Sequence, residues 1–297
     1  MEMSTPVRIA AFVVGLAVAF AAAVGLGRAV GPLDPETEPA MAGHESAGGE
    51  HGGEHGGHDS AATEVPGGLM VSQDGYTLSL ASTTAEAGRR EVGFTITDPD
   101  GHALTDYAVE HEKQLHLIAV RRDFAGFQHV HPTLGSDGTW TTDLELRPGA
   151  WRVLADFVPA GGEGLTLGAD LLVSGDAPPA APADDRRTDT PDGYTVDLAG
   201  DLESGAAADL TVRVSRDGEP VTDLEPYLGA YGHLVALREG DLAYLHVHPE
   251  DGEPGPDVPF VAEVPSAGTY RLFFDFQHDG EVRTASFVVT AGGGHEH

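Results

Sequence analysis

The sequence predicts an all-β protein built from two tandem β-sandwich modules of the immunoglobulin-like or cupredoxin-like type. Short runs of β-forming residues follow one another from Gly67 onward. Turn residues separate the runs, and the chain of 297 residues contains 40 glycines and 20 prolines. The same strings of residues also occur twice, which indicates a duplicated module. We therefore expect two β-sandwiches of about 100 residues each.

Five strands are expected in the first module. Turn dipeptides such as Asp100-Gly101 and Pro148-Gly149 separate them. The expected strands cover residues 76–82, 91–98, 115–121, 139–146 and 150–157. A second β series begins at Tyr194.

The two series are copies of one module. "HLIAV" at residues 116–120 matches "HLVAL" at residues 233–237, and "HVHP" occurs at residues 129–132 and again at 246–249. Both pairs are offset by 117 residues without a gap, which indicates a tandem duplication. We expect a first module over residues 67–175, a Pro/Ala/Asp linker over 176–190, a second module over 191–291 and a histidine-containing tail over 292–297.

Residues 1–30 are expected to form a membrane anchor. Arg8 is followed by 19 uncharged residues, a length that suits a short transmembrane helix, with a cleaved signal peptide as the alternative. In either case the acidic bulk of the chain is exported. We therefore expect the protein at the cell membrane with its bulk extracytoplasmic, or secreted if the segment is cleaved.

Residues 31–66 are expected to be a disordered linker, because Gly, Ala, Glu and His dominate it and apolar residues are scarce. Histidine-rich tracts of this kind capture metal ions loosely. The histidines concerned are His44, His51, His55 and His58.

The composition narrows the function. The net charge is −32 and Lys113 is the only lysine, so nucleic acid, whose phosphates would be repelled, is not expected as a partner. The chain contains no cysteine, which rules out disulfides, zinc–cysteine sites and blue-copper thiolate ligation. The 15 histidines are therefore the main candidates for metal binding.

Each module carries three histidines with the spacing H-x12-H-x-H. The two triplets are His116, His129 and His131 in the first module and His233, His246 and His248 in the second. Residues i and i+2 of a strand point to the same face, so the last two histidines of each triplet face the same way.

A hairpin would bring the first histidine of each triplet to the other two. In the second module a two-residue turn at Gly240-Asp241 places His233 opposite His248. In the first module a four-residue loop over residues 122–125 keeps the equivalent register. The three rings of each module would then converge on one patch of the sheet.

Three imidazoles that meet at one point are common ligands of Zn²⁺ and Cu²⁺. We therefore expect one three-histidine site for a divalent ion in each module. Asp156 and Asp275 occupy matching places in apolar strands, where a carboxylate needs a partner. We expect each to be a fourth ligand or a hydrogen-bond partner of a histidine. Pairing with Arg152 or Arg271, or with the backbone, is the alternative.

Three other histidines fall outside the shared pattern. His102, His111 and His278 have no histidine at the matching position of the other module, and we expect them to be exposed. "HEKQLH" at residues 111–116 has one residue more than the helical zinc motif HExxH, so no zincin site is expected.

With the anchor, the histidine-rich tether and the two strings that end in HVHP in view, the chain resembles a group of actinobacterial exported heavy-metal-binding proteins that carry this module. The resemblance covers residues 67–290. More loosely, the chain is similar to the CopC-like and YtkA-like β-sandwiches that handle copper, although their methionine ligands are missing here. The resemblance implies metal handling and supplies no reaction.

The sequence thus predicts a membrane-tethered, extracytoplasmic protein that binds Cu²⁺ or Zn²⁺ and is not an enzyme. Its delivery partner, a metal transporter or chaperone, stays open. A metal-dependent hydrolase or oxidase is one alternative, for which the two aspartates are the only evident bases. A non-metal adhesion or interaction module is the other.

Overall fold

The computed structural model describes residues 65–177, 184–245, 247–250 and 252–292. The expected anchor, the four histidines of the linker, His246 and the C-terminal tail lie outside these residues. Within the described part of the chain, no helix is long and apolar enough to cross a membrane.

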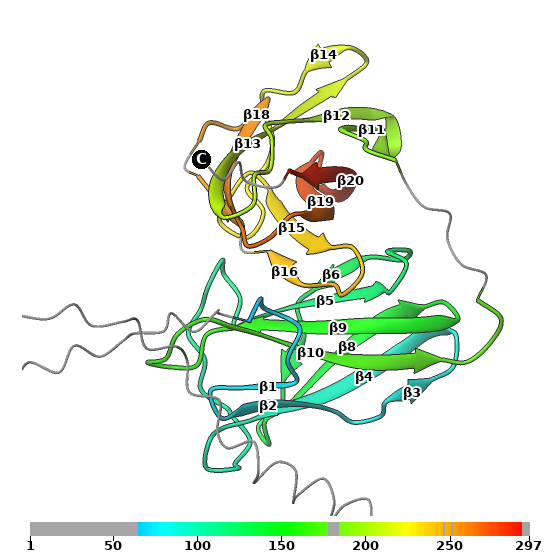
Figure 1. Cartoon of the computed structure of the whole chain (residues 1–297), viewed down its shortest axis with the longest axis vertical. Coiled ribbons are helices and arrows are strands. Elements are labelled where there is room, and N and C mark those ends of the chain that lie inside the picture. Colours follow the sequence, from blue (N-terminus) through cyan, green and yellow to red (C-terminus); the bar gives the residue numbers. More distant parts are fainter. Residues whose placement is uncertain (1–64, 178–183, 246, 251, 293–297) are drawn as a thin grey trace, which may run out of the picture. The chain divides into compact units, whose positions relative to one another are not determined.

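The first module is a sandwich of two five-stranded sheets, with the strand orders β1-β2-β4-β8-β7 and β3-β10-β9-β5-β6 (Figure 1). Adjacent strands pair antiparallel except β3 and β10, which are parallel. The strands of the first sheet are β1 Ser72–Gln73, β2 Tyr76–Leu80, β4 Gly88–Thr97, β8 Thr139–Leu146 and β7 Thr133–Leu134. Those of the second are β3 Thr84–Ala85, β10 Leu165–Val173, β9 Gly149–Phe157, β5 Leu115–Arg121 and β6 Gln128–Val130.

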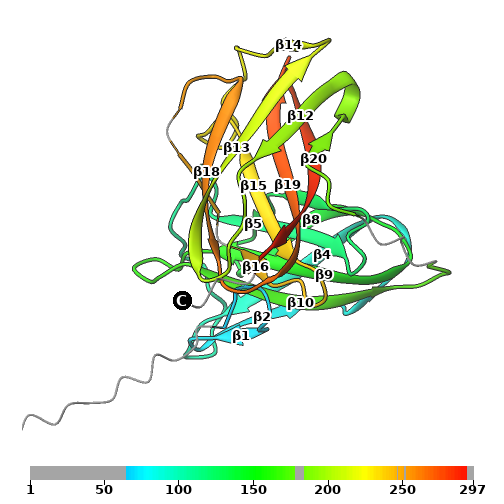
Figure 2. The ribbon, with the colours of Figure 1, turned by 45° about the horizontal axis from the view of Figure 1, so that its top comes forward.

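The second module repeats this architecture, with sheets in the orders β11-β12-β13-β18-β17 and β16-β15-β19-β20. A 3-10 turn, η1 Pro191–Gly193, precedes its long strands, which run up the picture in Figure 2. The first sheet contains β11 Thr188–Asp189, β12 Tyr194–Ala199, β13 Ala206–Arg216, β18 Asp257–Val264 and β17 Val247–Pro249, with β14 Glu219–Pro220 paired to β13. The other contains β16 Tyr244–Leu245, β15 His233–Arg238, β19 Gly268–His278 and β20 Glu281–Ala291. The predicted fold of two tandem immunoglobulin-like β-sandwiches is confirmed.

Each module encloses its own aromatic core. In the first module Trp140 stacks on Phe94 with 6.3 Å between ring centroids, and its Nε1–H donates to Tyr107 Oη at 3.0 Å. In the second module Phe274 stacks on Phe276 at 5.5 Å. Aromatic pairs of this kind contribute about 0.5–1.5 kcal/mol beyond the burial of their surface. The two cores therefore stabilise the two sandwiches separately.

A third apolar cluster joins the modules. Along β5, Leu117 and Ala119 point into the first module's core, whereas Ile118 and Val120 point to the opposite face of the sheet and belong to the third cluster. The second module contributes equivalent residues from β15. The buried members of the cluster are Ile118, Val120, Leu154, Val235, Leu237, Leu242 and Phe273.

Because of this cluster, β5 and β15 are buried on both faces, which agrees with their nearly continuous apolar sequences. The ring of Phe127, next to β6, stacks on Phe273 of β19 with 3.9 Å between centroids. Contacts group residues 60–297 into one compact unit. The face of β5 that carries His116 is thus the face that meets the second module.

Candidate metal centre

The strand pairing in the first module has the predicted register. Ile118 of β5 lies opposite His129 of β6, and Leu117 lies opposite Val130. His116 lies two residues before Ile118 and therefore shares its face of the sheet. This register brings His129 and His131 beside His116.

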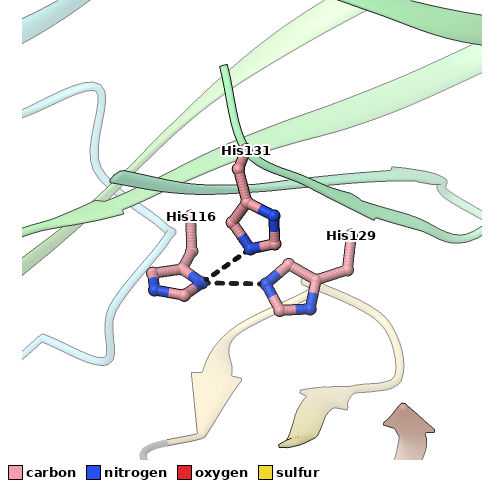
Figure 3. Close-up of side chains that lie close together, drawn as sticks. All are labelled: His116, His129 and His131. Atoms are coloured by element: carbon pink, nitrogen blue, oxygen red, sulfur yellow. Dashed lines mark hydrogen bonds between the residues drawn. The ribbon is translucent and has the colours of Figure 1, made fainter. Parts of the chain in front are cut away.

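The three rings meet at one point (Figure 3). Nδ1 of His116 lies 3.1 Å from Nε2 of His129 and 3.2 Å from Nε2 of His131. One ring nitrogen from each of the three histidines lies within 4.8 Å of the others. Three potential nitrogen ligands therefore converge.

In two of the rings, the outward nitrogen, which is the one that points away from the other histidines, has a hydrogen-bond acceptor. Nε2–H of His116 donates to the carbonyl oxygen of Glu110 at 3.2 Å, and Nδ1–H of His129 donates to Oδ2 of Asp275 at 2.9 Å. Each of these oxygens only accepts, so the proton of each neutral ring is on the outward nitrogen. When both rings are neutral, the lone pairs of His116 Nδ1 and His129 Nε2 therefore face each other at 3.1 Å.

Burial keeps the rings of His116 and His131 neutral. Removal from water, followed by repulsion from His129, lowers the pKa of His116 from 6.5 to about 3. The same causes, with His116 as a further neighbour, lower the pKa of His131 to about 3. Loss of solvation penalises the charged form of a base. Near neutral pH, His116 and His131 therefore offer lone pairs rather than cations.

A tight turn orients His116. Residues 110–113 close on themselves, because Glu110 and Lys113 exchange backbone hydrogen bonds of 2.9 and 3.0 Å. The two central residues, His111 and Glu112, have φ of 48° and 64°, as in the hairpin turns that need positive φ at both positions. The carbonyl of Glu110 is thereby held beside Nε2 of His116.

Asp275 belongs to the second module but forms a hydrogen bond with His129 of the first. Its backbone in β19 lies opposite His233 of β15, it is 3% exposed, and its Oδ1 accepts a hydrogen bond from Thr284 at 2.5 Å. The expected role as a partner of a histidine is met by His129 of the other module. The arginine alternative is wrong for Asp275, because Arg271 pairs with Glu239 at 2.7 Å.

Asp156 occupies the matching position in the first module. It lies opposite His116 across β5 and β9, and its Oδ1 accepts from Thr166 Oγ1 at 2.8 Å. Burial and then the nearby Asp156 raise the pKa of Tyr244. Arg152 pairs with Asp170 at 3.0 Å instead, so the arginine alternative is wrong here too.

The second triplet is arranged differently from the prediction. The β15–β16 pairing has the predicted register, with Leu237 opposite Tyr244. However, β17 joins the other sheet, and His248 lies opposite Val261 of β18. His248 is exposed, so the expected opposition of His233 and His248 is wrong. The strand changes sheet after Leu245, which periodicity along the sequence does not reveal.

The predicted two-residue turn at Gly240-Asp241 is also wrong. Residues 239–243 separate β15 from β16. Leu242 within this loop adopts φ of 65° and buries its side chain in the third cluster. The turn is therefore longer than predicted, and it places Leu242 in the contact with the first module.

His233 is nevertheless oriented like His116. Its Nε2–H donates to the carbonyl oxygens of Tyr227 and Leu228 at 3.0 and 3.3 Å. Burial, followed by repulsion from His129, lowers its pKa to about 4. Its outward nitrogen is thus satisfied, as in His116, by a turn that precedes the strand.

Histidines of both modules line one cavity of about 220 Å³. Its walls include Asp156 together with His111, His116, His129, His233 and His248. A second cavity, of about 600 Å³, shares Asp156 and Tyr244 with it but none of these histidines. His116 and His129 of the first triplet and His233 and His248 of the second therefore border a common space.

Two neighbours of the cluster were missed in the sequence. The ring of His111 lies 5.1 Å from that of His233 and 6.1 Å from that of His116, although His111 is exposed as expected. The ring of Tyr227 lies 6.3 Å from that of His131. Both residues lie in the turns that precede β5 and β15. The sequences of these turns, at residues 110–113 and 227–230, differ at every position, so the repeat carried no signal for them.

The two other histidines outside the pattern differ from each other. His102 is exposed, as expected. His278 is only 9% exposed, which contradicts the expectation. Its Nδ1 lies 2.7 Å from Tyr194 Oη and its Nε2 lies 3.2 Å from Asp223 Oδ1. It is a hydrogen-bonded residue of the second sandwich.

The sequence matches the family described as Domain of unknown function (DUF8832) twice, at residues 71–173 and 188–293. No curated protein matches the chain. Among solved structures it is similar to the Escherichia coli adhesin FdeC, with 15% identity over 75% of this chain and 65% of that one and a TM-score of 0.25. The Yersinia pseudotuberculosis adhesin InvE gives 13% identity over 73% and 59%, with a TM-score of 0.23.

The chain spans less than two thirds of the length of either adhesin structure. Likenesses of this size concern the fold alone and do not bear on function.

Proposed function

The chain belongs to the DUF8832 family, and we propose from its histidine cluster that it is an extracytoplasmic, membrane-tethered protein that binds a divalent metal ion, Zn²⁺ or Cu²⁺. The ligands are Nδ1 of His116, Nε2 of His129 and Nε2 of His131. One observation carries the proposal: three ring nitrogens converge, and the outward nitrogens of two of these rings are bonded to oxygen acceptors.

The spacing of the nitrogens suits a small metal ion. Zn–N bonds of about 2.0–2.1 Å in a tetrahedral site imply nitrogens about 3.3–3.4 Å apart. The two short contacts, 3.1 and 3.2 Å, differ from that value by a small fraction of an ångström. These two contacts suit ligation of one ion, and one nitrogen of each of the three rings lies within 4.8 Å of the others.

The electrostatics also favour a cation. The lone pairs of neutral His116 and His129 would repel each other, and the low pKa values of His116 and His131 disfavour a proton on either of those two rings. The buried carboxylate of Asp275 lies one ring away, and the whole chain has a net charge of −32. A divalent ion would relieve the repulsion and offset the carboxylate.

A binding role is better supported than an enzymatic one. Ligand pockets usually measure about 300–1,000 Å³, whereas the cavity at the histidines measures about 220 Å³. A metal-dependent hydrolase or oxidase would need room for a substrate beside the ion. The adhesion alternative does not explain why the three ring nitrogens converge, because histidines with a purely structural role need not point at one another.

The remaining expectations complete the proposal. Residues 1–30 would tether the protein, and His44, His51, His55 and His58 would capture ions and pass them to the folded site. A metal transporter or chaperone would be the exchange partner. A second site at His233, His246 and His248 stays part of the proposal, with His246 outside the described residues.

Calorimetric titration of residues 60–297 with Zn²⁺ and with Cu²⁺ tests the proposal. We expect at least one tightly bound ion per chain, and one fewer in the double variant His129→Ala/His131→Ala. His278→Gln is the matched control, because this histidine is hydrogen-bonded to Tyr194 and Asp223 within the second sandwich, and it should bind as the wild type does. Unchanged stoichiometry in the double variant would contradict the proposal.

A further inference from the structure

A buried hydrogen bond crosses the boundary between the modules at the metal centre. Asp275 Oδ2 accepts from His129 Nδ1–H at 2.9 Å, and the two side chains are only 5% and 4% exposed. All three nitrogen ligands belong to the first module, whereas this carboxylate belongs to the second. The contact therefore lies between a ligand and a residue about half the chain away.

The carboxylate is held firmly in place. Thr284 of β20 donates to its other oxygen at 2.5 Å, and β19 pairs with β15 and β20 on either side. Phe127 and Phe273, which lie two residues before His129 and Asp275 along the chain, stack with 3.9 Å between their ring centroids. The aromatic stack and the His129–Asp275 bond thus form two adjacent contacts between the same two segments.

The bond has a consequence for the ligand. Without an acceptor at Nδ1, a neutral histidine can carry its proton on either nitrogen, and a proton on Nε2 would block metal binding there. A carboxylate at Nδ1 fixes the proton on that side and makes Nε2 a stronger donor to a metal. A bound cation in turn strengthens the Nδ1–H···carboxylate bond.

We propose that Asp275 is the positioning residue of the metal centre: it fixes the ring orientation and tautomer of His129, so that a site whose ligands all come from the first module is complete only when the second module is docked. The inference rests on the proposed function, since it concerns the same ion. It means that metal binding and docking of the modules favour each other, because each strengthens the same hydrogen bond.

A control is available elsewhere in the second module. Asp223 lies beside His278, with its Oδ1 3.2 Å from Nε2 of that ring, and neither residue lines the cavity at the histidines. Asp223→Asn and Asp275→Asn therefore make the same chemical change beside a histidine, while only the second removes the carboxylate that accepts from His129 Nδ1–H.

The first measurement needs no metal. Two-bond ¹H–¹⁵N correlation spectra of residues 60–297, with chelator present, report which nitrogen of each imidazole carries the proton. We expect His129 in the Nδ1–H form in the wild type and in Asp223→Asn, and loss of that form in Asp275→Asn. A wild-type His129 with its proton on Nε2 would overturn the inference.

The second measurement is Zn²⁺ affinity by competition with a chromophoric chelator. Loss of an outer partner of a histidine ligand costs about 10–100-fold in affinity, and we expect a loss of that size in Asp275→Asn but less than about threefold in Asp223→Asn for the same site. Equal affinity of Asp275→Asn and the wild type would overturn the inference alone. A wild type that binds neither Zn²⁺ nor Cu²⁺ would overturn the proposed function together with it.

Discussion

His116 of the first module and His233 of the second lie with their ring centroids 6.3 Å apart and their planes 29° from parallel. They are equivalent residues of the duplicated sequence, 117 positions apart. Each donates from Nε2 to the carbonyl of the residue six positions earlier, Glu110 or Tyr227. Duplication has therefore placed two equally oriented histidines on either side of one interface, where a single cavity adjoins both.

The role of His116 can be separated from that of His233. His116→Ala removes the nitrogen that contacts both other ligands. Loss of an outer partner of a ligand costs about 10–100-fold in affinity, so we expect loss of this ligand to lower the Zn²⁺ affinity by at least about 100-fold. His233→Ala should leave the triplet of the first module able to bind. Chelator competition on both variants checks this, and equal losses would argue against a site centred on His116.

Metal binding should stabilise the folded protein. An ion present at 100 times its Kd adds about 2.7 kcal/mol to the free energy of unfolding if it binds only the folded state. We expect the melting temperature to rise with Zn²⁺ and to return with a chelator. The His129→Ala/His131→Ala variant should show no such rise, and a rise of the same size there would place the ion elsewhere.

Stability of the metal-free protein should fall as the pH falls. His116 and His233 have pKa values of about 3 and 4 in the folded state, whereas the unfolded chain takes up these protons near 6.5. Because both folded values are depressed, the unfolded state binds more protons between pH 6.5 and about 4. Each buried histidine therefore lowers the free energy of unfolding by up to about 1.4 kcal/mol per pH unit in that window.

Urea unfolding at pH 7 and pH 5, with chelator present, measures this dependence. His116→Asn should reduce the loss of stability between the two pH values, whereas His102→Asn, at an exposed position, should not. Equal pH dependence in His116→Asn and the wild type would contradict the assignment of a buried neutral ring.

The third apolar cluster should contribute strongly to stability. Phe273 is 6% exposed and stacks on Phe127, so Phe273→Ala should lower the free energy of unfolding by about 3 kcal/mol or more. Val282→Ala, at a position 45% exposed on β20, should change it by less than about 0.5 kcal/mol. Urea unfolding of the two variants gives the comparison, and similar small effects would mean that the modules are not packed through this cluster.

The sequence was sufficient to predict five strands of the first module, though not β10, together with the duplication and the register that places His129 opposite Ile118. These features depend on local patterns: alternation along strands and a fixed offset between repeats. The pairing of Asp275 with His129 could not be predicted, because it depends on how one module packs on the other. A signal was present in "LHLIAV", where both faces of β5 are apolar apart from His116. An exposed outer face would have alternated with polar residues.

The second triplet shows the limit of the same reasoning. Register counted back from Leu245 holds for Tyr244 and Leu237, but it cannot reveal that the strand leaves its sheet and that β17 pairs with β18. Strand exchange between the sheets of a sandwich is a tertiary feature. His248 was therefore placed opposite the wrong neighbour.

The most direct test is the position of the ion in a crystal of the Zn²⁺-loaded protein, located by anomalous scattering at the zinc edge. We expect one ion about 2.0–2.1 Å from Nδ1 of His116, Nε2 of His129 and Nε2 of His131, with Asp275 still bonded to Nδ1 of His129. The account would be contradicted if the three rings kept their present contacts with no ion between them while zinc was found elsewhere.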